Sequence, residues 1–550
     1  MSAFKDAVKI AVVAVCVTAL TAGSVGAFGD GKFFKKFRNR GIRNVIVMIP
    51  DGCDQSVLTA ARWYKQYFQA DNAPLALDRM GNTGMVKTYM ANSVITGSAA
   101  AGTAFATGHK TTVRFLSVGP DPDKAFNLTG FVSSIAPYAP IMTVLEGAKT
   151  RGKATGLIAT SRITHATPAA YGSHIDDRGK DNDIMEHLVY QDIDVVFGGG
   201  RRHLLTTDQG GKRTDGEDLL QEMLHRGYQF VETADEMAAV YSGRVWGLFA
   251  DSHMEADIDR AEFAPTQPSL AEMTEKAIDL LSQNRRGFFL MVEGSQVDWA
   301  GHANDPIHMI TDFLAFDAAV AKAMEYADRH PNTLVMVFPD HNTGAMSVGH
   351  EQSNYPPGYT ATTVEDLLDP LRGMQISATG VDRKIDALGG YTVANVQSAL
   401  LTWWGLNVSS DHAQEIVDLV NAGEYGNNAV GEVVSKYCTV FGWTTHGHSG
   451  EDVPLWSYGR NRPVGLFDNT ELAQVVASAF NFELKGSGMW VEYPESVLNT
   501  TNIDANPVAT IDGTRYPVSK DIMIVDGVSK DLLGITVYAP ESGKVYIPVQ

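Results

Sequence analysis

The stretch NVIVMIPDG, residues 44–52, carries the pattern that decides the fold. Five apolar, mostly β-branched residues are followed by a proline and an Asp51-Gly52 turn, which is typical of a buried strand that ends in a tight loop. Similar apolar runs return at residues 155–160, 195–197, 247–250, 288–292 and 333–338, with amphipathic stretches between them. This alternation predicts an α/β fold with a central, mostly parallel sheet flanked by helices.

One of the amphipathic stretches can be followed residue by residue. Ser269 and Glu272 have the spacing of a capping box, in which each side chain satisfies a free backbone N–H of the first helical turn. An apolar stripe at helical spacing follows, made of Leu270, Met273, Ala277, Leu280 and Leu281. The sequence therefore predicts a helix that leads directly into the buried strand at residues 288–292.

The alternation predicts three parts in the mature chain. Residues 28–483 are expected to form the main α/β domain, interrupted by an insertion at about residues 347–440. The insertion is rich in glycine, proline and polar loops, with one helix-like segment at residues 393–406. Residues 484–550 are rich in turns and contain short alternating runs at 522–525, 534–538 and 544–549, which predict a small β-rich appendage.

The first 27 residues have the composition of a secretory signal peptide. Lys5 and Lys9 precede an apolar run at residues 10–20, and Val25-Gly26-Ala27 offers a cleavage site of small residues. The run is short for a membrane span, and no second segment of spanning length follows. We therefore expect an exported protein, periplasmic or extracellular, whose mature chain has no stable membrane span.

Cysteine usage adds little to this interpretation. Cys16 lies in the expected signal peptide, which leaves Cys53 and Cys438. These two could pair in an oxidising compartment, but a disulfide framework is not expected.

The chain is 550 residues long and carries a formal net charge of −20 at pH 7. Nucleic-acid binding requires a basic surface, so the charge argues against such a partner. The acidic residues are spread along the sequence, which is consistent with a soluble surface.

Acidic and histidine residues stand where the predicted strands end. Asp51, Glu293 and the pair Asp340-His341 follow three of the strands, and His165 and Thr167 lie just beyond a fourth. The carboxyl ends of parallel strands open on one crevice, where ligands bind. These residues are therefore expected to converge on one site.

Their chemistry indicates metal ions. Asp298 and His302 are four residues apart, so one helical turn would place both on the same face. Carboxylates with imidazoles suit zinc, and carboxylates with a hydroxyl suit magnesium. Each residue alone has an ordinary structural explanation, such as a turn, a loop or a helix cap. Burying so many ionisable groups in one cleft costs free energy through desolvation and mutual repulsion. Because a bound metal ion would offset this cost, the residues taken together favour a metal site.

Ser98 lies in a stretch of small residues, TGSAAAGTAFATG at 96–108, that would let a helix begin at the serine. A helix N-terminus offers free N–H groups and partial positive charge to an anion such as phosphate. The alternative is that Ser98 only caps the helix.

These segments together resemble the alkaline phosphatase family, in order from about residue 43 to 480. The resemblance is carried by residues 44–52 and 96–108, THATPAA (164–170), GGGR (198–201), GLFA (247–250), FFLMVE (288–293), Asp298 with His302, Asp340-His341, and HSGED (448–452). It implies the hydrolysis of small phosphate monoesters, two Zn²⁺ and one Mg²⁺ per site, and a homodimer.

The resemblance also implies a role for each matching residue. Ser98 would be the nucleophile and form a phosphoserine intermediate, and Arg178 would bind the substrate phosphate. Asp298, His302 and His448 would hold the first zinc, and Asp51, Asp340 and His341 the second. Asp51, Thr167 and Glu293 would hold the magnesium, with His165 close by.

Three positions depart from the family pattern or leave a choice. Gly97 replaces the aspartate that usually precedes the nucleophile, which removes a carboxylate expected near Arg178. Trp299 stands where some relatives carry lysine or histidine near the phosphate, and it could contact substrate or simply pack. His446 competes with His448 for the zinc position, and the imidazole of His165 leaves zinc conceivable at the third metal.

Two other functions remain open from the sequence. A phosphodiesterase or sulfatase could have similar metal-binding residues at the strand ends. The sequence, however, lacks the Cys/Ser-x-Pro-x-Arg segment of a sulfatase nucleophile. An exported metal- or phosphate-binding protein without catalysis is the second, with Gly97 as its best support.

Overall fold

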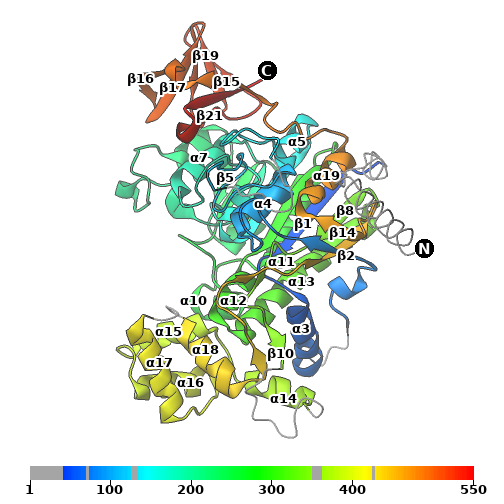
Figure 1. Cartoon of the computed structure of the whole chain (residues 1–550), viewed down its shortest axis with the longest axis vertical. Coiled ribbons are helices and arrows are strands. Elements are labelled where there is room, and N and C mark those ends of the chain that lie inside the picture. The colour runs from blue at the N-terminus through cyan, green and yellow to red at the C-terminus, as the bar shows by residue number, and fades with distance from the viewer. Residues whose placement is uncertain (1–40, 70–72, 125–132, 350–361, 424–427, 550) are drawn as a thin grey trace, which may run out of the picture.

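The structure is a computed structural model that describes residues 41–69, 73–124, 133–349, 362–423 and 428–549 (Figure 1). The expected signal peptide at residues 1–27 lies outside these residues. Among the described residues, no helix has both the length and the apolar character needed to span a bilayer. Cys53 and Cys438 are both free thiols.

A ten-stranded sheet forms the centre of the molecule, in the order β14-β2-β13-β8-β1-β7-β3-β4-β6-β5. Its central strands are β1 (Asn44–Pro50), β7 (Phe288–Gly294), β8 (Thr333–Val337) and β3 (Ala154–Arg162), and they run parallel. On one side follow β4 (Val195–Gly199), β6 (Val245–Leu248) and β5 (Gln229–Val231), also parallel. The predicted α/β fold is confirmed, and each predicted strand is present.

The other side of the sheet contains strands that the alternation did not predict. β13 (Val453–Gly459) runs antiparallel to both β8 and β2 (Asn82–Lys87), and β14 (Gly465–Asp468) is parallel to β2. Only two residues of β2 and β14 together are fully buried, Val86 and Phe467, so neither strand has the continuous apolar run of a central strand.

Alternate residues of the central strands face two separate cores. In β1, Ile46 and Met48 pack with the helices α3 (Gln55–Phe68), α11 (Leu270–Leu281) and α13 (Pro306–Arg329). Val45, Val47 and Ile49 pack on the opposite face with α4 (Ser98–Thr107), α5 (Val144–Thr150), α7 (Asp181–Tyr190) and α19 (Asn469–Phe480). This period of two is what a strand buried on both faces requires.

The predicted capping box is present at α11. Ser269 is the N-cap residue, and its side chain and that of Glu272 each accept a hydrogen bond from the other residue's backbone N–H. The helix ends at Leu281, shortly before β7, as predicted.

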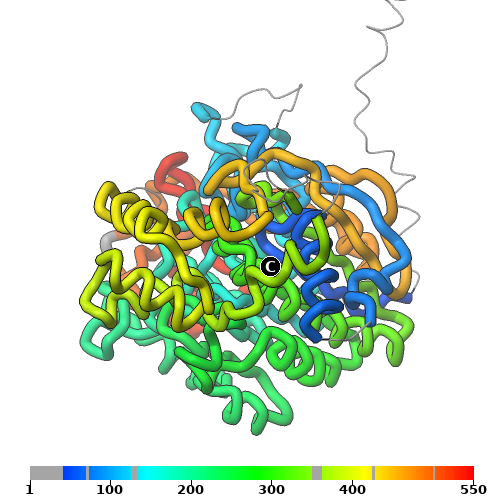
Figure 2. Tube along the Cα trace, turned by 90° about the horizontal axis from the view of Figure 1, so that it is seen from below, coloured from blue at the N-terminus to red at the C-terminus, as the bar shows by residue number. Residues whose placement is uncertain are grey.

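The insertion is largely helical, which corrects the prediction of loops with one helix. It contains α14 (Val364–Leu368), α15 (Ala378–Ala387), α16 (Val393–Trp404), α17 (Ser410–Ala422) and α18 (Ala429–Cys438). Thr363, Ser377, Thr392 and Ser409 cap four of these helices, and several glycines fall between them, so the polar composition reflects helix ends. We call α14–α18 the helical insertion; Figures 1 and 2 show α15–α18 (yellow) as a group on one side of the molecule.

The C-terminal residues form two small antiparallel sheets at the opposite end of the long axis (Figure 1). One contains β15 (Trp490–Pro494), β22 (Lys544–Pro548) and β21 (Val537–Ala539). The other is a meander of β16 (Leu498–Ile503), β17 (Asn506–Ile511), β18 (Thr514–Pro517), β19 (Ile522–Val525) and β20 (Val528–Asp531). We call residues 484–549 the C-terminal module.

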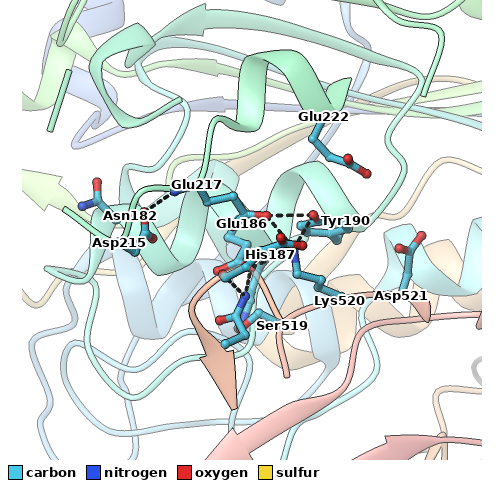
Figure 3. Close-up of polar contacts among 12 residues, drawn as sticks. Asn182, Glu186, His187, Tyr190, Asp215, Glu217, Glu222, Ser519, Lys520 and Asp521 are labelled. Carbon is cyan, nitrogen blue, oxygen red and sulfur yellow. Dashed lines mark hydrogen bonds and ion pairs between the residues drawn. The ribbon is translucent and has the colours of Figure 1, made fainter. Parts of the chain in front are cut away.

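Three consecutive residues between β18 and β19 attach the C-terminal module to α7 and its surroundings (Figure 3). Ser519 Oγ lies 3.2 Å from His187 Nε2, and Lys520 Nζ lies 2.5 Å from both Tyr190 Oη and Glu217 Oε1. Asp521 accepts two hydrogen bonds from Arg226, at 2.8 and 3.1 Å. We call Lys520, Glu186, Glu217 and Arg213 the docking cluster; all four side chains are buried.

Candidate active site

Ser98 is the first residue of α4 and lies beside His341, which follows β8. Gly97 is the N-cap residue, so Ser98 does not cap the helix, contrary to the alternative above. The serine is 2% exposed, and its Oγ lies 3.1 Å from His341 Nε2. Gly102, in the next turn, lies so close to α6 (Ala166–Ala169) that a Cβ atom there would be 3.1 Å from Ala170 Cβ. The small residues thus let α4 start at the serine and pack tightly.

The strand-end carboxylates gather in one buried cluster. Asp51, Glu293 and Asp340 are fully buried and Asp298 is 4% exposed. Glu293 lies within β7, which extends further than the apolar run predicts. We call these four residues, with Thr167, His302, His341 and His448, the strand-end cluster.

Several oxygen atoms of this cluster have no hydrogen-bond partner. They are both carboxylate oxygens of Asp51, Oε1 of Glu293, Oδ2 of Asp340 and Oγ1 of Thr167. A buried polar atom without a partner is costly, and several together in one place are rare in a folded protein. These unpaired oxygens are therefore a set of ligand atoms that fits bound cations.

The pKa values in the strand-end cluster reflect the burial of these acids and the repulsion between them. Burial raises the pKa of Asp51 well above its usual value, and the charges of Asp340, Asp298 and Glu293 raise it further. Burial also raises the pKa of Glu293 to about 7. Asp340 differs, because although burial opposes ionisation, the neighbouring His341 holds its pKa below the usual value. Bound cations would relieve this repulsion.

Potential ligand atoms come within 4.8 Å of one another in three groups: Asp298 with His302 and His448, Asp51 with Asp298 and His341, and Asp51 with His165 and Glu293. The first group contains the residues expected at the first zinc. The second has Asp298 where Asp340 was expected, but Asp340 Oδ2 is 3.1 Å from His341 Nε2 and therefore borders the same space. The third contains Asp51 and Glu293 of the expected magnesium set.

The structure places His446 and His448, the two candidates for one zinc position, in different surroundings. His448 Nε2 lies 3.6 Å from Asp298 Oδ1, and its ring stacks on His341 with centroids 3.7 Å apart. His446 instead contacts Glu432 at 3.2 Å and the backbone oxygen of His302. Geometry therefore favours His448 as the ligand candidate.

Backbone shape brings α12 (Gln296–Ala303), which carries Asp298 and His302, against the loop after β1. Gly52 has a φ of +69°, and a Cβ atom there would lie 2.8 Å from Asp298 Cα and 2.7 Å from Thr343 Oγ1. Thr343 Oγ1 in turn donates a 2.6 Å hydrogen bond to Asp298 Oδ1. Only glycine fits at this corner, and Thr343 orients the carboxylate.

Arg178 approaches the cluster through His165. Its Nη2 lies 2.7 Å from His165 Nε2, and Gly97 offers no carboxylate to it. Burial, together with the nearby charges of Arg178 and Arg162, holds the pKa of His165 well below its usual value, so the ring is neutral. A neutral imidazole that accepts at Nε2 carries its proton on Nδ1, an atom without a partner here. His165 therefore has one lone pair, available either to Arg178 or to a metal ion.

Trp299 and His165 belong to a group of rings that also contains His253. The His253 and Trp299 centroids are 4.3 Å apart, and His165 lies 5.7 Å from each. Arg162 holds His253 from the backbone N–H and from Nη1, at 3.2 and 2.6 Å. His253 is not among the residues predicted from the sequence, although it follows β6 as the other candidates follow their strands, so the same strand-end signal could have identified it.

Comparison with known proteins places the chain among relatives of known activity. The family model described as alkaline phosphatase matches residues 42–482. Alkaline phosphatase 3 of Bacillus subtilis is 33% identical over 504 residues, covering 88% of this chain and 98% of that protein. Alkaline phosphatase of Escherichia coli K12 is 32% identical over 366 residues, covering 58% and 73%.

A solved structure supports the same assignment. The crystal structure of Thermus thermophilus alkaline phosphatase superposes with a TM-score of 0.71 at 28% identity, covering 84% of this chain and 96% of that one. The chain therefore belongs to the alkaline phosphatase family, whose members are metal-dependent enzymes that hydrolyse phosphate monoesters.

Proposed function

We propose that the chain hydrolyses phosphate monoesters through a phosphoserine intermediate on Ser98. The observation that carries this proposal is the position of Ser98 Oγ, at a helix N-terminus and 3.1 Å from His341 Nε2, beside buried carboxylates with unpaired oxygens. A nucleophile, an anion-binding helix end and a cation-binding cluster are the three parts that phosphoryl transfer requires.

The residues present fit the expected metal ions. Asp298, His302 and His448 would hold one zinc, and Asp51, Asp340 and His341 a second. Asp51, Thr167 and Glu293 would hold magnesium, whose preference for oxygen suits these three side chains, with His165 as a neighbour. Bound there, the ions would neutralise phosphate charge and lower the pKa of a coordinated hydroxyl or water.

The protein residues supply the remaining steps. Ser98 Oγ attacks phosphorus after its proton passes to solvent, and the ester oxygen leaves with the electron pair of the P–O bond and takes up a proton. A water then cleaves the Oγ–P bond, which releases inorganic phosphate and returns a proton to Ser98 Oγ. The N–H groups at the start of α4 and the guanidinium of Arg178 bind the phosphoryl oxygens. His165 orients Arg178, and the ring of Trp299 covers one side of the site. Two in-line displacements would retain configuration at phosphorus.

Release of p-nitrophenol from p-nitrophenyl phosphate by the zinc- and magnesium-loaded mature chain tests this function. Ser98→Ala is expected to lower kcat by on the order of 10³-fold or more, because the residue forms the covalent bond. Acid quenching with ³²P-labelled substrate should trap label on the parent chain and none on the variant. Ser282→Ala, an exposed serine on the surface, is the matched control.

Unlabelled protein during steady turnover, with activity retained in Ser98→Ala, would contradict the intermediate. Preference for bis(p-nitrophenyl) phosphate would instead indicate a phosphodiesterase. Zinc binding without any turnover would indicate a binding protein.

We further propose export, cleavage after Ala27 and a homodimer, with residues 28–483 as the catalytic domain. The charge and cleavage-site pattern of residues 1–27 supports export. N-terminal sequencing of protein from the periplasm or medium should begin at Phe28, and light scattering should give twice the mass of the mature chain.

A further inference from the structure

A cavity lies next to Trp299, the chain neighbour of Asp298, at the junction with the helical insertion. It is a cleft of about 360 Å³ lined by residues 252–256, by Gln296 and Trp299 of α12, by His308 of α13 and by α15. Figure 1 shows α10 (Asp257–Phe263), α12 and α15 next to one another in this region. Its volume is in the range of small-molecule sites.

One aromatic layer separates this cleft from the expected phosphate position. Trp299 and His253 both line the cleft, and their rings also contact the ring of His165. His165 in turn contacts Arg178. The cleft therefore lies one ring layer beyond His165, which contacts Arg178.

The insertion side of the cleft is firmly held. Asp259 of α10 accepts hydrogen bonds from the Ser377 backbone at 2.7 Å and from its hydroxyl at 2.5 Å. Asp305 accepts one from the Ala378 N–H at 2.6 Å. A Cβ atom at Gly380 would lie 2.8 Å from Asp259 Oδ1, so α15 packs directly on α10. The cleft is thus a preformed site, which lowers the entropy that a ligand must lose to bind.

The lining combines a flat ring with polar side chains. His308 is 4% exposed, its Nε2 has no hydrogen-bond partner, and the nearest carboxylate oxygen, Asp312 Oδ2, is 3.5 Å away. Burial lowers the pKa of His308 to about 3, so the imidazole is neutral. Arg383, 44% exposed, pairs with Glu255 at 2.9 Å, and both residues line the cleft. Ser252 and Thr379 add hydroxyl groups.

We propose that this cleft receives the alcohol part of the substrate and selects monoesters whose alcohol is a hydroxyl-bearing ring, such as a hexose. The indole face suits the C–H face of such a ring, and the imidazole, guanidinium and hydroxyl groups suit its hydroxyls. The proposal rests on the proposed function, because it assigns the phosphate end of the substrate to Ser98.

Glucose 6-phosphate and ethyl phosphate test the cleft, since both release a primary alcohol and differ mainly in the ring. For the metal-loaded parent chain, kcat/KM is expected to be about tenfold higher for glucose 6-phosphate, the size of effect that contacts in one specificity pocket provide. Thr379→Trp, which fills the cleft, and Arg383→Met should remove most of this preference. Ethyl phosphate turnover should stay within about twofold, because it does not reach the cleft.

Arg372→Met is the matched control, since Arg372 is an exposed arginine of the same insertion that pairs with Asp369 at 2.6 Å, and it does not line the cleft. It should leave the preference unchanged. Equal kcat/KM for both esters in the parent chain would overturn the proposal. So would equal losses for both esters in Thr379→Trp.

Failure of the proposed function would look different. If the parent chain hydrolyses neither ester, calorimetric titration with the same two esters decides about the cleft. Tighter binding of glucose 6-phosphate that is lost in Thr379→Trp would support the cleft, and equal binding of the two esters would overturn it.

Discussion

The docking cluster and the strand-end cluster are both buried groups of ionisable residues, but they satisfy their charges in different ways. In the docking cluster, Lys520 and Arg213 lie among Glu186, Glu217 and Asp215, within 4 Å in each ion pair. In the strand-end cluster, the structure records no ion pair between its four carboxylates and any lysine or arginine of the described residues. The ion pairs recorded for Asp51, Asp298 and Asp340 are all with histidines.

This difference distinguishes the docking cluster, which has a structural role, from the strand-end cluster, which fits a functional one. A buried carboxylate paired with a cation from the chain is a docking contact, whereas several buried carboxylates with unpaired oxygens fit a cation from solution. The two clusters should therefore respond in opposite directions when a charge is removed from the metal-free protein.

The largest effect is expected for Asp51→Asn, which removes the acid shared by two of the three ligand groups. Phosphomonoesterase kcat/KM should fall by on the order of 10³-fold, as expected when charge stabilisation at a reacting centre is lost. The metal-free variant should nevertheless be more stable than the metal-free parent by about 1 kcal/mol, because like-charge repulsion is relieved. Denaturant unfolding with chelator present measures the second effect.

Asp208→Asn, at an exposed acid of the short 3-10 helix Thr207–Gln209, is the control for that change. A metal-free Asp51→Asn variant that is less stable than the metal-free parent would contradict the expected contrast between the two clusters, because the carboxylate would then have a structural partner.

Metal removal should be the next largest effect. Saturating zinc and magnesium should raise the free energy of unfolding by about 4 kcal/mol at a thousandfold excess over the dissociation constant, since the folded state alone offers the site. Thermal unfolding with and without chelator measures this shift. The same increment in Lys520→Met would show that the ions act at the strand-end cluster only; an increment that disappears there would place an ion in the docking cluster.

Lys520→Met should lower the free energy of unfolding by about 3 kcal/mol, because it leaves the buried carboxylate of Glu217 without its lysine partner. Lys530→Met is the matched control, as Lys530 lies on the exposed strand β20. Urea unfolding of both variants checks this expectation. Equal stability of the two would mean that the docking cluster contributes no net stabilisation.

The smallest effect concerns pH. Burial and the nearby Glu217 raise the pKa of Glu186 well above its usual value, so the folded chain holds this proton while the unfolded chain has lost it. Because the folded state binds more protons, stability falls as pH rises above about 4.5, until the folded pKa is reached. Glu186→Gln keeps the neutral shape, so its stability relative to the parent should rise over this window by about 1 kcal/mol. Urea midpoints at pH 5 and pH 8 measure this difference; a constant difference would contradict it.

The sequence was sufficient for the central sheet and for the residues at its strand ends. Residues such as Ile46 to Ile49 are buried on both faces of the sheet, so their apolar run reports the strand directly. Strands β2 and β14 at the sheet margin are partly exposed, and their mixed composition carries no such signal. The helices of the insertion were missed for a related reason, because their caps are polar residues that also occur in loops.

The contacts that depend on side-chain placement could not be derived from local pattern. The approach of Arg178 to His165 joins residues that the sequence assigned to different roles. The same is true of Lys520 beside Tyr190, and of the cleft between α12 and α15, which depend on how distant segments pack. Such contacts depend on tertiary packing, and the spacing of residues along the chain does not predict them.

The order of the strands also has a consequence for how the protein is made. Strand β1 appears early in synthesis, but its neighbours in the sheet are β7 and β8, at residues 288–294 and 333–337. The group of Asp298, His302 and His448 is complete only when the last of these residues has emerged. Such long-range pairing makes folding slow. A growing chain therefore lacks one of its three candidate ligand groups until His448 is available, so this group can hold an ion only late in synthesis.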